Sequence, residues 1–260
     1  MTVKYMSEKK MPLVLVFAGP NGSGKSTITS MVKISGMYIN ADEIKKSTQC
    51  DDLEAAQIAE KLRNNCVDRK QDFTFETVLS TQRNMDLLRR AKKQGFFIKA
   101  FFVLTHSSQV NIARVKVRKA NGGHDVPIDK IVSRYERSLA ILPELIRLSD
   151  VCNVYDNTAE CPQRIFSKKK DTYRLWETAF FSKERILALT GFTGVLTSVN
   201  STQEYLKKEV TAQELTLLKE AKIPVEVCKK DQRICIRFEH SLQPKIETIL
   251  QQSVSQRTKK

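Results

Sequence analysis

Residues 13–27, LVLVFAGPNGSGKST, decide the fold that this 260-residue sequence predicts. Residues 13–18 form an apolar run rich in valine and leucine, which is typical of a strand buried on both faces. The run stops at Gly19, and Gly19, four further residues and Gly24-Lys25-Ser26 complete the pattern G-x-x-x-x-G-K-[ST]. A strand before this pattern and a helix after it are the context that a phosphate-binding loop requires, whereas a chance glycine-rich turn needs neither.

Each position of this loop has its own expected task. The glycines let the backbone curl so that successive N–H groups point at phosphate oxygens, while Lys25 reaches the β- and γ-phosphates. The hydroxyl of Ser26 is expected to ligate Mg²⁺. The loop residues expected to bind a nucleotide are Gly19, Asn21, Gly22, Ser23, Gly24, Lys25, Ser26 and Thr27.

Composition limits the kind of protein. A chain of 260 residues has room for one α/β domain and a smaller appendage, which we place at residues 1–160 and 161–260.

The net charge of +15 favours an anionic partner such as a nucleotide, a phosphorylated sugar, nucleic acid or anionic lipid, and a solvated basic surface is the alternative. The six cysteines show no C-x-x-C pairing, and no stretch reads as a signal peptide or a membrane span, so we expect a cytoplasmic protein with reduced thiols.

Strand and helix patterns alternate through the larger part of the chain. Apolar runs predict strands at 37–40, 73–78, 96–104 and 151–155, and helical periodicity predicts helices at 26–35, 51–70, 83–95, 108–121 and 127–148. This alternation predicts a parallel sheet with helices on both faces.

After residue 160 the sequence no longer alternates between strand and helix patterns in the same way. Residues 162–170 predict a surface linker, and residues 173–189 predict an amphipathic helix that contains Trp176. A strand at 194–199, a helix at 211–221, a hairpin of 224–228 with 233–238 and a closing helix at 244–252 complete a small basic α+β module without a functional motif.

Two polar positions follow predicted strands. Asn40 and Asp42 come after the second strand, where ligands of open α/β sheets bind, although Asp42 is equally well placed as a helix N-cap. Glu76 lies in the third strand, where a buried carboxylate needs a partner: a Mg²⁺-bound water, the Lys25 ammonium or a substrate hydroxyl.

Basic side chains gather on two predicted helices that a glycine-rich break, GGHDVP at 122–127, separates. Such helices predict either a lid that delivers arginines to a transferring phosphoryl group or a solvated basic hairpin. The basic residues are Arg114, Arg118, Lys119, Arg134 and Arg137.

The ordered set of motifs carries a family resemblance. GPNGSGKST at 19–27, NADE at 40–43, FETVLS at 75–80 and GGHDVP at 122–127 together resemble the zeta-toxin family of P-loop kinases, and more narrowly its chromosomal zeta-like branch. The resemblance covers about residues 12–157 and implies an adenylate-kinase-like α/β fold with ATP as phosphoryl donor. In the toxins the acceptor is the 3′-hydroxyl of a UDP-activated amino sugar.

The resemblance also implies roles for single residues. Asp42 corresponds to the base that accepts the sugar hydroxyl's proton, Glu76 to a glutamate that contacts substrate, and Arg118 and Arg134 to lid arginines on the ATP phosphates. The catalytic set is then Lys25, Asp42, Arg118 and Arg134, with Arg118 also binding the nucleotide and with Ser26 and Glu76 at the metal.

One segment departs from the toxins. They carry Gly-Thr-Gly-Arg after the strand-end glutamate, where this chain has Thr77-Val78-Leu79-Ser80. The sequence therefore does not identify the acceptor molecule. Arg83 is a candidate for the missing arginine. The expected substrate-binding residues are Asn40, Asp42, Glu76, Thr77 and Arg83.

Three functions therefore fit the sequence. The first is an ATP/Mg²⁺-dependent kinase of zeta-toxin type acting on a small hydroxyl acceptor; the second is a nucleic-acid end or tRNA kinase; the third is a non-catalytic ATP-dependent regulator. The resemblance further implies an antitoxin partner, or inhibition in cis by residues 161–260.

Overall fold

A computed structural model describes residues 11–123, 125–194, 198–200, 205–221, 223, 225–230, 233–239, 242 and 245–250. The chain divides into two compact units, Met1–Val199 and Asn200–Lys260. His124 of the predicted glycine-rich break and residues 244, 251 and 252 of the predicted closing helix lie outside the described residues, whereas residues 245–250 are helical.

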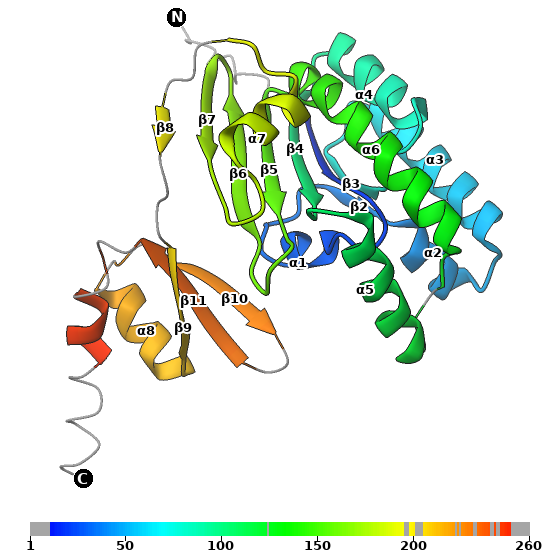
Figure 1. Ribbon diagram of the computed structural model, residues 1–260. Coiled ribbons are helices and arrows are strands. Elements are labelled where there is room, and N and C mark those ends of the chain that lie inside the picture. The colour runs from blue at the N-terminus through cyan, green and yellow to red at the C-terminus, as the bar shows by residue number, and fades with distance from the viewer. Residues whose placement is uncertain are drawn as a thin grey trace, which may run out of the picture. The chain divides into compact units, whose positions relative to one another are not determined.

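Between Leu13 and Asp156 one or two helices separate each strand from the next, as the sequence predicts, and two further strands then follow without a helix (Figure 1). The strands of the first unit are β1 (Leu13–Ala18), β2 (Met37–Ile39), β3 (Phe73–Thr77), β4 (Phe97–Leu104), β5 (Val151–Asp156), β6 (Gln163–Lys169), β7 (Thr172–Trp176) and β8 (Ser198–Asn200). Its helices are α1 (Lys25–Thr29), α2 (Ala41–Thr48), α3 (Asp52–Asp68), α4 (Arg83–Lys93), α5 (Ser108–Ala120), α6 (Ile128–Leu148) and α7 (Lys183–Thr190).

The strands form one sheet in the order β2-β3-β1-β4-β5-β6-β7-β8. Strands β2, β3, β1, β4 and β5 pair in parallel, which requires helical crossovers between them, whereas β6 and β7 add to the edge in antiparallel pairs. The parallel part confirms the predicted P-loop kinase fold, and it brings the carboxyl ends of β1, β2 and β3 to the same edge.

The side chains of β1 show why both faces of the sheet are covered. Val14, Val16 and Ala18 belong to the large core under α3, α4 and α6, and Leu15 and Phe17 belong to a second core with Ile28 of α1. Since neighbouring side chains of a strand point to opposite faces, the unbroken apolar run at 13–18 is explained by helices on both sides (Figure 1).

Helix α1 is much shorter than the helix predicted at 26–35. It ends at Thr29 because serine, threonine and β-branched residues dominate the segment, and the Ser30 hydroxyl bonds the carbonyl of Thr27 at 2.9 Å. Gly36 does adopt a left-handed φ of 63°, but it precedes β2 instead of ending a helix.

The segment after residue 160 differs most from the prediction. The predicted linker and the predicted helix around Trp176 are the antiparallel hairpin of β6 and β7, and the helix α7 begins only at Lys183. The hairpin belongs to the main sheet because β6 pairs with β5 and buries Ile165 and Phe166. The boundary between compact units therefore follows Val199, where we expected it at residue 160.

The second unit is a small α+β module, as predicted. Strands β9 (Tyr205–Val210), β10 (Glu226–Lys230) and β11 (Arg233–Glu239) form a sheet in the order β10-β11-β9, with the predicted hairpin at β10 and β11. Helix α8 (Ala212–Glu220) begins with a capping box between Thr211 and Glu214. Its own core consists of Val210, Leu215, Leu218, Ile236, Ile246 and Leu250.

Candidate active site

The phosphate loop runs from the end of β1 to the start of α1, at the carboxyl edge of the parallel sheet. Its first amide, the N–H of Gly19, donates to the carbonyl of Thr77 at the end of β3 over 3.2 Å. This hydrogen bond fixes the start of the loop to the strand that carries Glu76.

Two buried asparagines hold the loop from the other side. The Asn111 side chain, on α5, donates to the carbonyl of Asn21 at 2.6 Å, and the Asn157 side chain, just after β5, donates to the carbonyl of Ser23 at 2.8 Å. Both are at most 5 % exposed. The sequence analysis did not single out either residue, although Asn157 follows a strand end, the same position rule that drew attention to Asp42.

This close bracing explains two of the loop glycines. A Cβ on Gly24, whose φ is 86°, would lie 2.1 Å from Nδ2 of Asn157, and a Cβ on Gly22, whose φ is 76°, would lie 2.6 Å from the carbonyl oxygen of Asn111. Only glycine combines these conformations with such close neighbours.

Lys25 is the electrostatic centre of the site. Its ammonium donates to the carbonyl oxygens of Gly19 at 2.8 Å and Pro20 at 3.2 Å. Burial lowers the pKa of Lys25 to about 8, the carboxylates of Glu76 and Asp42 raise this pKa in part, and Arg118 lowers it. Lys25, Asp42, Glu76 and Arg118 are thus brought together from four separate segments of the chain.

Glu76 finds partners that the sequence analysis did not consider. Its Oε1 accepts hydrogen bonds from the hydroxyl of Thr29 on α1 at 2.7 Å and from the hydroxyl of Tyr38 on β2 at 2.8 Å. The carboxylate is therefore oriented by neutral donors, and it acts on the Lys25 ammonium through its charge. Burial, together with the charge of Glu76, raises the pKa of Tyr38, so this hydroxyl keeps its proton.

Asn40 and Asp42 lie where α2 begins. Asn40 is the N-cap, because its side-chain oxygen accepts a 2.9 Å hydrogen bond from the backbone N–H of Asp42 and its Nδ2 donates to Tyr38. The alternative role that we considered for Asp42, the N-cap, thus belongs to Asn40. Asp42 is exposed in the first turn of α2, which leaves its carboxylate available to a ligand.

The predicted lid is only partly exposed. Helix α6 packs against the sheet through Ile141, Leu142 and Leu145, and Val126 and Ile131 join a small core with α5. In the described residues of the predicted lid, the end of α5 and the glycine-rich break are exposed.

The predicted lid arginines divide in the same way. Arg134 of α6 donates to the side chain of Asn21 in the phosphate loop at 3.3 Å, and Arg118 acts on Lys25 through its charge. Arg114 instead donates to the carbonyl of Thr158, beyond β5, at 3.1 Å. Two of the arginines therefore approach the phosphate loop, as the resemblance implies.

Thr77 begins the segment that departs from the toxins, and Arg83 follows that segment at the start of α4. The hydroxyl of Thr77 accepts hydrogen bonds from the N–H of Leu79 at 2.9 Å and from Nδ2 of Asn84 at 2.8 Å. Arg83 forms a 3.2 Å ion pair with Glu60 of α3, and its side chain is 70 % exposed. In this structure, therefore, Thr77 fixes the turn after β3, and Arg83 lies toward α3.

The residues present suit a magnesium ion. Ser26 and Thr29 are three residues apart on α1, and Thr29 contacts Glu76, so the Ser26 hydroxyl and a carboxylate face the same region. Hydroxyl and carboxylate oxygens are ligands that Mg²⁺ accepts when substrate phosphates complete its coordination. Among the described residues there is no cluster of three or more Cys, His, Asp or Glu that would hold a metal by itself.

A family model ties these observations together, since the model of the zeta toxins matches residues 1–178 of the chain. The chain belongs to the zeta toxin family. The match includes the phosphate loop, Asp42, Glu76, both arginine helices and the β6–β7 hairpin, and it stops before the C-terminal unit.

Individual proteins are also similar to parts of the chain. An uncharacterized protein of Haemophilus influenzae is 28% identical over 127 residues, which are 46% of this chain and 91% of that protein. Among solved structures, AvrRxo1-ORF1:-ORF2 with ATP has a TM-score of 0.55 at 14% identity, and the same pair with sulphate ions has a TM-score of 0.53 at 14% identity. Each alignment covers 70% of this chain and 64% of the other, so it is a likeness of fold between this zeta toxin and part of a larger chain.

Within the described parts of this zeta toxin, no helix combines the length and the apolar character needed to cross a membrane.

Proposed function

We propose that this zeta toxin is an ATP- and Mg²⁺-dependent kinase that phosphorylates a hydroxyl group of a small acceptor. The observation that carries the proposal is the convergence of charges on Lys25: the carboxylates of Glu76 and Asp42 and the guanidinium of Arg118 all act on the ammonium of the phosphate loop. A donor phosphate and an acceptor hydroxyl would need this combination, because the first requires cations and the second requires a base.

The phosphate loop would hold the donor. Backbone amides of residues 22–25 would bind phosphate oxygens, and Lys25, together with Arg118 and Arg134, would neutralise the charge on the transferring group. Arg134 already contacts Asn21, so it needs little movement to reach a phosphate bound there. Ser26 and Glu76 would hold Mg²⁺, which would supply positive charge to offset that of the phosphate oxygens.

The acceptor would bind at the ends of β2 and β3. Asp42 would take the proton of the acceptor hydroxyl as its oxygen forms a bond to the γ-phosphorus, while the bond from that phosphorus to the bridging oxygen breaks and ADP leaves. Asn40, Glu76 and Thr77 would position the acceptor, because they stand at the same edge of the sheet. The first acceptor to test is a UDP-activated amino sugar, the substrate implied by the family resemblance.

The proposal includes a partner. Such a kinase would be kept inactive by a partner that covers its ATP site. The partner would be either a separate antitoxin or the C-terminal unit of the same chain. For the second possibility, deleting residues 200–260 should raise the rate of phosphate transfer. An unchanged rate in a folded truncated chain would leave the separate antitoxin as the candidate.

The decisive experiment follows labelled phosphate. The full chain is incubated with γ-labelled ATP and Mg²⁺, first with a UDP-amino sugar and then with a host metabolite extract, with Lys25→Ala as the matched control. We expect a labelled metabolite that requires Lys25. If no free metabolite is labelled while ATP still binds, the protein is a nucleotide-dependent regulator and the kinase proposal fails.

A further inference from the structure

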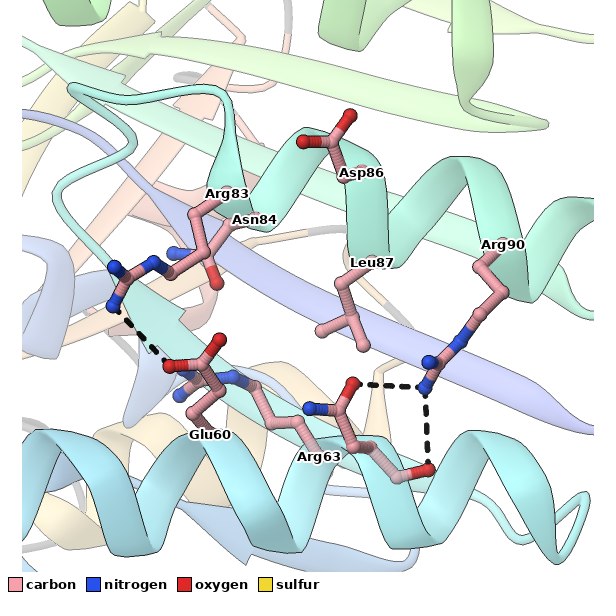
Figure 2. A pocket seen from close by; sticks show the side chains of 8 residues that line it. Glu60, Arg63, Arg83, Asn84, Asp86, Leu87 and Arg90 are labelled. Carbon is pink, nitrogen blue, oxygen red and sulfur yellow. Dashed lines mark hydrogen bonds and ion pairs between the residues drawn. The ribbon is translucent and has the colours of Figure 1, made fainter.

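A polar pocket lies away from the phosphate loop, between α3 and α4. The cavity has a volume of about 320 Å³, and Figure 2 shows that side chains from both helices line it. A cavity of this size accommodates a small metabolite or a large part of one. Its lining residues are Glu60, Arg63, Asn64, Arg83, Asn84, Asp86, Leu87 and Arg90.

Arg63 is the unusual member of this set. It is only 8 % exposed, and its guanidinium lies 5.4 Å from the centre of the Phe75 ring. Its Nε is buried and has no hydrogen-bond partner within the part of the chain that the structure describes. A buried guanidinium with an unused donor is costly unless a ligand supplies the acceptor.

Two further arginines stand at the ends of the pocket, and each links α4 to α3. Arg83 pairs with Glu60 at 3.2 Å, and Arg90 donates to the side chain of Asn64 at 2.8 Å (Figure 2). Arg83 and Arg90 have side-chain exposures of 70% and 43%, so both guanidinium groups can turn toward a ligand.

The acidic residues of the lining do not balance this charge. Asp86 points away from the cavity in Figure 2 and pairs with Arg89 on the outer side of α4. Within the lining, Glu60 pairs with Arg83, whereas Arg90 lies 3.6 Å from Asp68, which is outside the lining. Burial lowers the pKa of Arg63, and the charge of Arg83 lowers it further, whereas Glu60 raises it, as expected for cations gathered in one cavity.

The pocket adjoins the proposed acceptor side of the active site. Phe75, the ring under Arg63, directly precedes Glu76 on β3, and Asn84 of the pocket donates to the hydroxyl of Thr77 at 2.8 Å. The pocket therefore lies beside the turn at 77–80, the segment that departs from the toxins.

We propose that the pocket between α3 and α4 binds a phosphoryl group, held by Arg63, Arg83 and Arg90. Guanidinium groups bind phosphate oxygens through paired N–H donors, and a phosphate offers enough acceptors for several of them. The group belongs either to the acceptor, bound with its hydroxyl toward Asp42, or to a separate phosphorylated metabolite. The first source rests on the proposed kinase function, whereas phosphate binding itself does not.

Arginine side-chain NMR tests the binding directly. Inorganic phosphate is titrated into the full ¹⁵N-labelled chain, with chloride at equal ionic strength as the reference, and the Nε–Hε signal of Arg63 is followed. We expect a saturable shift of this signal with phosphate, and its assignment follows from its loss in Arg63→Met. Because the readout is at Arg63, binding of phosphate at the phosphate loop does not interfere with it.

Two variants sharpen the test. Arg90→Gln, on the rim of the pocket, should keep the fold and weaken phosphate binding about tenfold, the effect of losing one hydrogen bond to a charged group. Arg69→Gln is the matched control, because Arg69 is exposed at the end of α3 and does not line the pocket. An Arg63 signal that phosphate leaves unmoved, or that chloride moves equally, would overturn the proposal even if kinase activity is present.

Kinetics then identifies the source of the phosphoryl group. If the acceptor carries it, Arg90→Gln should raise the KM for the acceptor and leave the KM for ATP unchanged. If both KM values are unchanged while Arg63 still responds to phosphate, the pocket binds a separate phosphorylated metabolite.

Discussion

The hydroxyl of Tyr38 donates a 2.8 Å hydrogen bond to Oε1 of Glu76, and this bond joins β2 to β3 at the edge of the sheet where the proposed substrates meet. Thr29 bonds the same oxygen at 2.7 Å. Since both hydrogen bonds are made to Oε1, we expect the second carboxylate oxygen to be the one that contacts a ligand. Tyr38 is therefore a positioning residue for Glu76.

Replacing Tyr38 tests this positioning. Tyr38→Phe should lower the free energy of unfolding by about 2 kcal/mol, since it deletes the hydrogen bond to the charged Glu76 and the one that Asn40 donates to the same hydroxyl. ATP affinity should stay unchanged, while the KM for the acceptor rises. Denaturant unfolding and nucleotide binding measure the first two quantities, and Tyr173→Phe, remote in the β6–β7 hairpin, is the control.

Substitutions of Lys25 and Asp42 should lower the kinase activity in different ways. Lys25→Ala should weaken ATP binding and lower kcat by about a hundredfold or more, because a cation facing the transferring phosphate is lost. Asp42→Asn should lower kcat by a similar factor with normal ATP affinity, because only the base is lost. Near-normal turnover of Asp42→Asn at saturating acceptor would contradict the role of Asp42 as base.

The bracing of the phosphate loop predicts coupled mutations. Gly24→Ala should weaken ATP binding about tenfold, because a left-handed φ is strained by roughly 1–2 kcal/mol and the new Cβ collides with Asn157. Adding Asn157→Ala should remove the collision, so the double variant binds ATP better than the sum of the single losses predicts. Strict additivity of the measured binding energies would show that the two residues do not interact.

Truncation should distinguish the two domain boundaries. A chain of residues 1–199 should unfold cooperatively, because it keeps every element of the first unit up to β7 and α7. A chain ending at residue 160 should be insoluble or unfolded, because it exposes the side of β5 that β6 covers and loses Phe166 and Phe181 from the core. Circular dichroism and thermal melting compare the two chains.

Salt dependence separates the two classes of acceptor. Phosphorylation of a small metabolite should change only a few-fold between 50 and 200 mM salt, despite the net charge of +15. A nucleic-acid kinase that contacts many backbone phosphates would lose about a thousandfold in affinity over that range, because counterions are released on binding. A steep loss of activity would therefore favour the nucleic-acid acceptor.

The fold of the first 157 residues could be predicted because local patterns and tertiary packing agree there. The apolar run before the phosphate loop is buried on both faces, and the alternating strands and helices leave few ways to build a parallel sheet. Of the candidate site, motif spacing and the family resemblance predicted Lys25, Asp42, Glu76 and Arg118, and in the structure the charges of the other three act on the Lys25 ammonium; their roles stay predictions.

The prediction failed where distant contacts decide the structure. Residues 162–170 resemble a basic linker, but Lys168 donates to the carbonyls of Ile146 and Arg147 at 2.8 Å each and so caps the end of α6. Asn111 and Asn157 went unrecognised for the same reason, because an isolated asparagine carries no pattern until its partner in the loop is known.

The hydrogen bond from Asn157 to Ser23 joins residues 134 positions apart, and it has a consequence for synthesis. While the ribosome is still making the chain, the phosphate loop exists long before the side chain that braces it has left the exit tunnel. A nascent chain shorter than about 157 residues therefore has the nucleotide motif without its bracing. The phosphate loop would therefore gain its full bracing only when most of the first unit has been synthesised.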